Sequence, residues 1–242
     1  IPADESFLLA SVGNCLAYCH FARREFSACA TAATDAYRQG QRAGAEYATG
    51  WASFLLGLTE IELGRLRSAK EHGERLERCA QISPVQYLSD LSNLLNAEIS
   101  TQMGDFERAA KLADRGKSFP SFFAAVEPIF LAIRGQARSQ LWSGDTESAR
   151  RTLLHGQDMA LASHKPRLHR LLILEEVGMS LNGGDLAGAE LIIARSGLRN
   201  PVPASQRLDN SSDPDDLIQL LEIRVLLAEN RVSEALKLLR VV

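Results

Sequence analysis

The stretch GRLRSA at residues 64–69 decides the fold, because its pattern returns along the whole chain. It recurs as GDFERA at 104–109, GDTESA at 144–149 and GDLAGA at 184–189, each forty residues after the one before. REFSAC at 24–29 lies one period earlier, and NRVSEA at 230–235 lies one period plus six residues later. Self-similarity at a fixed period is typical of repeat proteins, so the sequence predicts six repeats.

A helix-to-helix hinge explains the shared hexad. Glycine readily adopts the left-handed conformation that ends a helix, and the aspartate after it can accept hydrogen bonds from the first free N–H groups of the next helix. The apolar residue two places after the glycine and the alanine five places after it lie on one face of that helix. Seven residues before the hexad a small side chain recurs at Ala17, Gly57, Ala97 and Ala137, whereas Val177 and Ile223 break the pattern. We expect the small residues of the two helices to face each other.

Two helices per repeat give the predicted architecture. The residues before each hexad follow a helical period, for example Leu171, Leu174, Val177 and Leu181, and no stretch favours strands. Stacked helix pairs form an α-solenoid in which each pair contacts only its neighbours. The sequence therefore predicts an all-α fold, with about twelve helices in a right-handed solenoid that forms one domain over residues 1–242. The apolar end of the last helix leads us to expect a fragment of a larger protein.

Turn-forming residues mark the ends of the predicted repeats. We expect the prolines to fall between repeats, where the chain leaves one helix pair and enters the next. These prolines are Pro84, Pro120, Pro128, Pro166, Pro201, Pro203 and Pro214. Residues 199–216 are rich in Pro, Ser, Asn and Asp and account for the six-residue insertion, so we predict an exposed loop there.

The hinge resembles that of tetratricopeptide repeats (TPRs), although those recur at about 34 residues rather than forty. Units of this longer period, such as WASFLLGLTEIELGRLRSA at 51–69, resemble the superhelical sensor region of MalT-like, LuxR-type ATP-dependent transcriptional activators. The resemblance covers nearly all of the chain. It implies a signal-sensing, protein-binding module of a transcription regulator, between a nucleotide-binding module and a helix-turn-helix that are not in these residues. The alternative is a general TPR scaffold that docks peptides and has no link to transcription.

The TPR register, carried over from this resemblance, implies which side chains look into the concave groove. They belong to the first helix of each repeat and are Asn14, Tyr18, Trp51, Phe54, Glu98, Arg134, Arg138, Trp142, Asn182 and Arg224. Aromatic faces next to guanidinium groups can bind a sugar ring, a peptide or an anionic metabolite. The competing interpretation is that the Trp and Phe side chains fill the core between helices and that the Arg side chains are solvated.

Arg134 and Arg138 are the sharpest candidates of this set. They lie four residues apart on one predicted helix, where two like charges repel each other unless an anion lies between them. We predict that Glu98 or a bound acidic group engages the pair. Reversing the charge at Arg138 is then expected to weaken the binding of a ligand or partner.

Composition and motifs argue against several function classes. The 242 residues include 45% hydrophobic residues and carry a formal net charge of −3, which lacks the basic footprint of a non-specific nucleic-acid binder. No GxSxG elbow, GxxxxGK[ST] loop or GxGxxG motif occurs, so we expect no enzyme, no catalytic residue and no cofactor. The expected partner is a small-molecule effector or a regulatory protein or peptide, with no direct nucleic-acid contact and no membrane. Self-association through the apolar C-terminal end is a further option.

The cysteines bear on compartment and on metal binding. Cys15, Cys19, Cys29 and Cys79 are too few and too unevenly spaced for a disulfide framework, which favours a cytoplasmic protein. Cys15 and Cys19 lie one helical turn apart with Cys29 on the next helix, and together they form a nominal set of zinc ligands. Such cysteines are more often small core residues, so we expect no metal site.

Overall fold

The computed structural model describes residues 3–83, 85–117, 125–196 and 215–239. These residues form twelve helices and contain no strand, which confirms the predicted all-α fold. Most of the loop predicted at 199–216 lies outside the described residues, and its last two positions begin a helix. The predicted right-handed turn of the solenoid stays a prediction.

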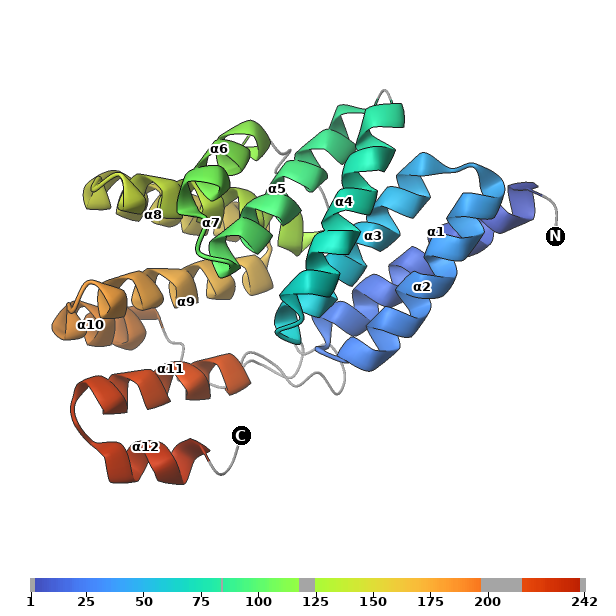
Figure 1. Ribbon diagram of the computed structural model, residues 1–242. Helices are drawn as coiled ribbons and strands as arrows, with labels where there is room; N and C mark the ends of the chain where they lie inside the picture. Colours follow the sequence, from blue (N-terminus) through green and yellow to red (C-terminus); the bar gives the residue numbers. More distant parts are fainter. Residues whose placement is uncertain (1–2, 84, 118–124, 197–214, 240–242) are drawn as a thin grey trace. The chain divides into compact units, whose positions relative to one another are not determined.

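The chain divides into two compact units, Ile1–Gly144 and Asp145–Val242, which are described in turn. A single domain over residues 1–242 therefore also stays a prediction. The first unit contains α1 (Ala3–Ala22), α2 (Phe26–Ala43), α3 (Glu46–Glu62), α4 (Leu66–Ile82), α5 (Gln86–Gln102), α6 (Phe106–Gly116) and α7 (Val126–Trp142). Within this unit, consecutive helices from α1 to α7 pack against each other. The first helices of the repeats also form a layer of their own, because α1 packs on α3, α3 on α5 and α5 on α7 (Figure 1).

The second unit contains five helices. They are α8 (Thr146–Ala162), α9 (Pro166–Asn182), α10 (Leu186–Ser196), α11 (Asp215–Ala228) and α12 (Val232–Leu239). Helix α9 is central, because it packs against α8, α10 and α11, and α11 packs against α12. The buried side chains Ile173, Val177 and Ile192 lie at the core of this unit.

Helix and turn lengths explain the period of forty. Helices α3, α4, α5, α7, α8 and α9 each contain 17 residues. Three-residue connections, such as 63–65 and 163–165, separate consecutive helices of this length. Two helices with two such connections make up one period of forty residues. The spacing of the hexads in the sequence therefore follows from the helix length.

The hinges have the predicted backbone conformation. Gly64, Gly104, Gly144 and Gly184 all have positive φ angles, between 71° and 87°. At Gly104 the N–H donates to the Thr101 carbonyl and the next N–H, of Asp105, donates to the Ser100 carbonyl. This pair of bonds closes the helix end and satisfies carbonyls that lack an intrahelical partner. Arg24 and Asn230 adopt the same conformation without being glycine, with φ of 58° and 60°.

The predicted aspartate caps are present where the hexad contains aspartate. The carboxylates of Asp105, Asp145 and Asp185 each accept a hydrogen bond from the backbone N–H three residues later, at 2.9–3.2 Å. Arg65 occupies the same position before α4 and makes no such bond. The sequence difference at this position therefore changes how the first turn of the helix is stabilised.

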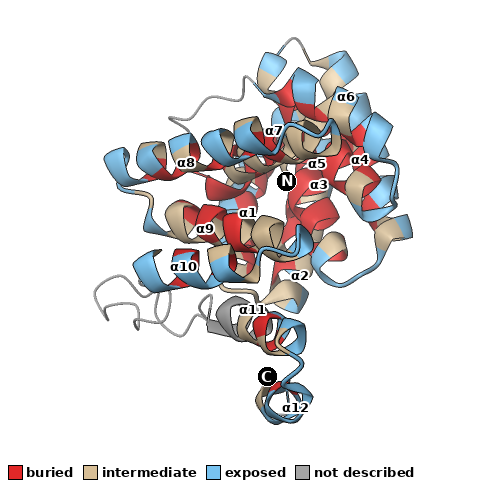
Figure 2. Cartoon of the chain, turned by 90° about the vertical axis from the view of Figure 1, so that its left-hand side faces the viewer, coloured by how far each residue is buried: buried red, intermediate tan, exposed pale blue. Residues whose placement is uncertain are grey.

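The small residues of the repeats are buried, and whether those of the two helices face each other stays a prediction. The alanines of the hexads, Ala69, Ala109, Ala149, Ala189 and Ala235, are at most 2% exposed. The positions seven residues before the hexads are buried as well, including Val177 and Ile223, which break the small-residue pattern. A Cβ atom on Gly57 would lie 2.7 Å from Leu95 Cδ2, so the absence of a side chain there permits close packing of α3 on α5. Figure 2 shows buried residues along the helix surfaces that face other helices.

One proline does not fall between repeats as predicted. Pro128 is the third residue of α7, whereas Pro166 begins α9. The first turn of a helix tolerates proline because its N–H groups have no intrahelical acceptor. Pro84, Pro120, Pro201, Pro203 and Pro214 lie outside the described residues.

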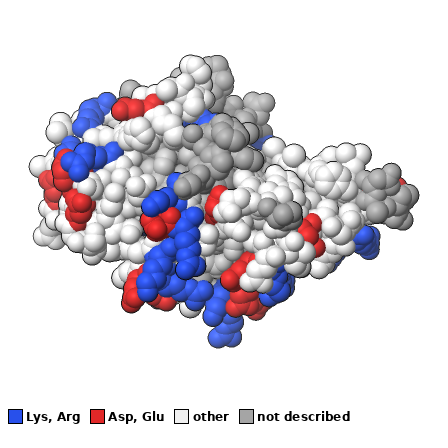
Figure 3. Space-filling view, turned by 90° about the horizontal axis from the view of Figure 1, so that it is seen from above, with Lys and Arg blue, Asp and Glu red and all other residues white. Residues whose placement is uncertain are grey.

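The surface carries charges of both signs. On the face drawn in Figure 3, Lys and Arg side chains are interleaved with Asp and Glu side chains, and no broad single-sign area stands out. In the part of the chain that the structure describes, no helix combines the length and the apolar character needed to cross a membrane.

Candidate functional site

Glu98 lies between the two predicted arginines in the first unit. Its Oε2 is 2.7 Å from Arg134 Nη2 and 3.7 Å from Arg138 Nη1. Glu98 belongs to α5 and both arginines belong to α7, so the contact joins neighbouring repeats. The prediction that Glu98 engages the pair is confirmed. The three side chains are 7%, 16% and 24% exposed, so the cluster is only partly open to solvent.

The surroundings of this cluster fix its geometry. Gln102 Nε2 donates to Glu98 Oε1 at 2.9 Å, and the Arg134 guanidinium lies 4.5 Å from the centre of the Phe130 ring. Burial by itself raises the pKa of the Glu98 carboxyl, but the charges of Arg134 and Arg138 and the hydrogen bonds to Glu98 outweigh burial. The pKa therefore lies below the ordinary glutamate value, and the carboxylate is ionised at neutral pH.

A small hollow adjoins the cluster between α5, α6 and α7. It is lined by Glu98 and Arg138 and by apolar side chains that include Leu94, Leu131 and Trp142. Its volume of about 10 Å³ is room for about one water molecule. Next to it, the rings of Trp142 and Phe106 have their centres 4.9 Å apart, and Phe106 is 48% exposed. We call Glu98, Arg134, Arg138 and Trp142 the Glu98 site.

A group of aromatic rings joins α1, α3 and α5 of the same unit. The Trp51 ring lies 6.5 Å from Tyr18, 5.4 Å from Phe54 and 6.1 Å from Tyr87, measured between ring centres. Tyr18 and Trp51 are partly exposed, and their place in a ligand-binding groove stays a prediction. Tyr87 was missed by the sequence reasoning, although it lies one period after Tyr47, whose ring it contacts.

Two predicted groove residues prove to be core residues. Phe54 is 0% exposed, so it cannot contact a ligand, and the competing interpretation of a core aromatic is correct for it. Asn14 is also buried, and its amide donates to the Ala48 carbonyl of α3 at 2.9 Å. Both occupy one register position, together with Leu94 one period later, which is buried as well. Side chains at this register position pack against the neighbouring repeat and are shielded from solvent.

One contact contradicts the expectation that each repeat touches only its neighbours. The backbone N–H of Val126, at the start of α7, donates to the Tyr18 hydroxyl of α1 at 2.9 Å. These residues belong to the first and fourth repeats. The first turn of a helix has N–H groups without an intrahelical acceptor, and Ala125 provides no side-chain cap for α7. The Tyr18 hydroxyl, which belongs to a distant repeat, therefore caps the first turn of α7.

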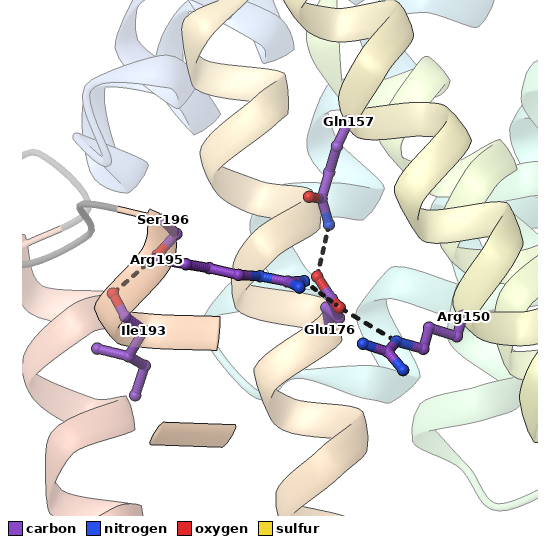
Figure 4. A network of polar contacts seen from close by, with 6 residues as sticks. All are labelled: Arg150, Gln157, Glu176, Ile193, Arg195 and Ser196. Atoms are coloured by element: carbon purple, nitrogen blue, oxygen red, sulfur yellow. Dashed lines mark hydrogen bonds and ion pairs between the residues drawn. The ribbon is translucent and has the colours of Figure 1, made fainter. Parts of the chain in front are cut away.

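The second unit holds the remaining predicted residues and a carboxylate that the sequence reasoning missed. Arg224 donates to Asn182 Oδ1 at 2.7 Å, and both side chains are exposed. Glu176 on α9 is 1% exposed and accepts hydrogen bonds from Arg195 at 2.8 Å and Gln157 at 2.9 Å (Figure 4). Arg150 lies 3.7 Å from the same carboxylate. The sequence offered one indication of this contact, because Glu176 is a charged residue within the apolar face of α9.

The cysteines do not come together as a metal site. Cys15 and Cys19 are exposed on α1, whereas Cys29 is buried and its sulfur lies 3.2 Å from the Thr59 hydroxyl. Within the described ranges, no group of three His, Cys, Asp or Glu side chains is placed to hold a metal ion.

No protein-family model, curated protein or solved structure gives a significant match to this chain.

Proposed function

We propose that this chain is a non-catalytic helical-repeat module that binds a segment of a partner protein at the Glu98 site. One observation carries the proposal: a buried carboxylate holds two guanidinium groups beside a partly exposed Trp–Phe ring pair. Guanidinium groups and aromatic faces are the groups that most often anchor protein partners.

The size of the hollow favours a protein segment over an enclosed small effector. Small-molecule pockets have volumes of roughly 300–1,000 Å³, and the hollow at the Glu98 site measures about 10 Å³. A partner can instead place one or two side chains against Arg138, Trp142 and Phe106 from the outside. Its remaining contacts would then extend along the surface of the neighbouring helices.

A peptide-binding experiment tests this function. The purified chain would be immobilised and exposed to a random dodecapeptide library, and the bound peptides sequenced. The variant Arg138→Glu should lose most of the enrichment. Arg151→Glu is the matched control, because Arg151 is an exposed arginine on α8 whose partners are Glu147 and Ser148. Equal enrichment by wild type and Arg138→Glu, with both folded, would exclude the site as the binding surface.

A narrower candidate is the sensor region of a LuxR-type transcriptional activator in the cytoplasm. The observation that favours it is the forty-residue period of hinges, which is longer than the TPR period. Under this proposal the partner segment would belong to a regulatory protein. Alternatively, a small-molecule effector would contact several repeats and shift the populations of two superhelical states. Reading the coding sequence on both sides of these 242 residues tests it. Encoded nucleotide-binding and helix-turn-helix modules would support the proposal, and other neighbours would exclude it.

A further inference from the structure

Helix α1 exposes an apolar face whose counterpart on α3 is buried. Four large apolar residues of α1 are 43–63% exposed, and two exposed cysteines lie among them. We call this set the α1 face, and its members are Leu8, Leu9, Val12, Cys15, Leu16 and Cys19. The positions one period later on α3 are at most 5% exposed, and they are Ala48, Thr49, Ala52, Leu55, Leu56 and Thr59. A register that is buried on α3 is therefore exposed on α1, in the part of the chain that the structure describes.

On α3 this register is a helix-packing surface. Helix α2 packs against α3, and the Cys29 sulfur lies 3.2 Å from the Thr59 hydroxyl. Gly40 of α2 approaches so closely that a Cβ atom on it would lie 2.6 Å from the Thr49 hydroxyl oxygen. On α1 the register is more apolar, because Leu9 lies where α3 has Thr49. The α1 face thus has the position and the chemistry of a surface that receives another helix.

The spacing of the α1 face suits a single partner helix. Leu8, Val12, Cys15 and Cys19 follow one another at intervals of four, three and four residues. This is the spacing of the apolar seam of a coiled coil, in which side chains of one helix insert between those of the other. Leu16 follows Cys15 directly and widens the seam on one side.

The α1 face carries no charge that would oppose pairing with itself. Residues 6–21 include no Asp, Glu, Lys or Arg, and the His20 Nδ1 lies 2.6 Å from Glu25 Oε2. A helix that is uncharged on all sides is typical of a buried helix. Two copies of this face do not repel each other, whereas a charged partner would bury its charges there without counterparts. The absence of charge therefore favours a second copy of the same face.

We propose that two copies of this chain form a twofold dimer in which the α1 face of one copy packs against the α1 face of the other. In such a dimer the same surface patch of both copies meets at the symmetry axis. The exposed parts of the six side chains amount to roughly 400–500 Å² per copy, so the pair would bury about 800–1,000 Å², which is the range of weak interfaces. The dimer is therefore reversible and dissociates on dilution. It goes beyond the proposed function, because the Glu98 site lies on other helices of the unit.

Sedimentation velocity of the purified chain, from about 1 to 300 µM in a reducing buffer, tests the dimer by mass action. The mass should rise from the 26.5 kDa of one chain to twice that value and stop there. Val12→Glu places one negative charge of each copy in the seam and should remain monomeric. Its fold should persist, because Val12 is exposed and glutamate is a better helix former than valine. Leu191→Glu is the matched control, because it makes the same change at an exposed apolar residue inside α10, and it should dimerise like wild type.

The thiols of Cys15 and Cys19 provide a second readout, because the dimer would cover both. At a total concentration of ten times the Kd, about one fifth of the chains are monomers, so alkylation by iodoacetamide should be about fivefold slower in wild type than in Val12→Glu. Cys29 and Cys79 are buried, and burial raises the pKa of both thiols, so they should react slowly in either state. Mass spectrometry of the peptides assigns the alkylation to each cysteine.

Three results would overturn this dimer. The first is a constant mass of one chain at every concentration, and the second is growth beyond twice that mass, which indicates head-to-tail association. The third is a dimer that persists in folded Val12→Glu, or that is lost instead in Leu236→Glu, a change at an exposed residue of α12. The proposed function is tested separately, because Val12→Glu should still enrich library peptides and Arg138→Glu should still dimerise.

Discussion

Replacing glycine by alanine should have opposite effects on stability at two nearby positions, one inside a helix and one at its hinge. Gly178 lies inside α9 and Gly184 lies at its hinge, six residues later in the same unit. A Cβ atom added at Gly184 would meet nothing within 4 Å, and one at Gly178 would meet only Arg224 Nη1, at 3.8 Å. Steric crowding is therefore negligible at both positions. They differ in backbone conformation, because Gly184 has a φ of 76° and Gly178 is helical.

The magnitudes follow from that difference. An alanine at Gly178 should stabilise the protein by about 0.8–1 kcal/mol, the difference in helix propensity between alanine and glycine. An alanine at Gly184 must adopt the left-handed conformation, which costs roughly 1–2 kcal/mol. Alanine also has less conformational freedom than glycine in the unfolded chain, and this difference offsets about 0.4–1 kcal/mol of the cost. The net loss at Gly184 is about 1 kcal/mol, so the two variants should differ by about 2 kcal/mol.

Urea denaturation followed by circular dichroism at 222 nm measures both effects. The unfolding midpoint should rise for Gly178→Ala and fall for Gly184→Ala, with the same slope for both variants. If both substitutions shift the midpoint in the same direction, backbone conformation does not govern the hinge, and the explanation of the repeated glycines is wrong.

Three further predictions concern the contacts between repeats and the helix caps. Glu98 has a lowered pKa in the folded protein, so the stability it contributes is fully present above the unfolded glutamate pKa of about 4.3 and is lost as the pH falls through the lower folded value. Urea midpoints measured from pH 6 to pH 3 should thus decline less steeply for Glu98→Gln than for wild type, and parallel curves would contradict the lowered pKa. Tyr18→Phe removes the acceptor of the Val126 N–H and should cost about 1–2 kcal/mol; hydrogen exchange at Val126 should accelerate, whereas unchanged exchange would show that the bond does not persist in solution. Asp105→Ala removes the cap of α6 and should lower the free energy of unfolding by about 1 kcal/mol, and a midpoint equal to that of wild type would mean that the cap adds nothing.

The Glu98 cluster was predictable because it follows the repeat. Glu98 and Arg138 lie one period of forty residues apart and so occupy the same register on neighbouring first helices, which pack against each other. Arg134 lies one turn before Arg138 on the same face of α7. The like-charge spacing of the two arginines supplied the reason to look for a carboxylate between them.

Exposure was harder to predict than position. Phe54 and Trp51 were both assigned to a groove, yet Phe54 is fully buried and Trp51 is partly exposed. They lie three residues apart on α3. A rotation of the helix about its axis therefore decides which of the two side chains packs against the neighbouring repeat. Register in the sequence fixes the order of residues around a helix, but packing fixes the angle at which the helix faces its neighbours.

The sequence by itself determined the helices, their lengths and their hinges, because these depend on local interactions. Glycine conformation, helix capping and the 3.6-residue period act within a few residues, and the forty-residue spacing repeats them along the chain. Only the tertiary structure decided that the Tyr18 hydroxyl caps α7, that Glu176 gathers Arg195 and Gln157, and that Phe54 belongs to the core. Those outcomes depend on distances between side chains of different helices, and these are set by how closely the helices approach one another.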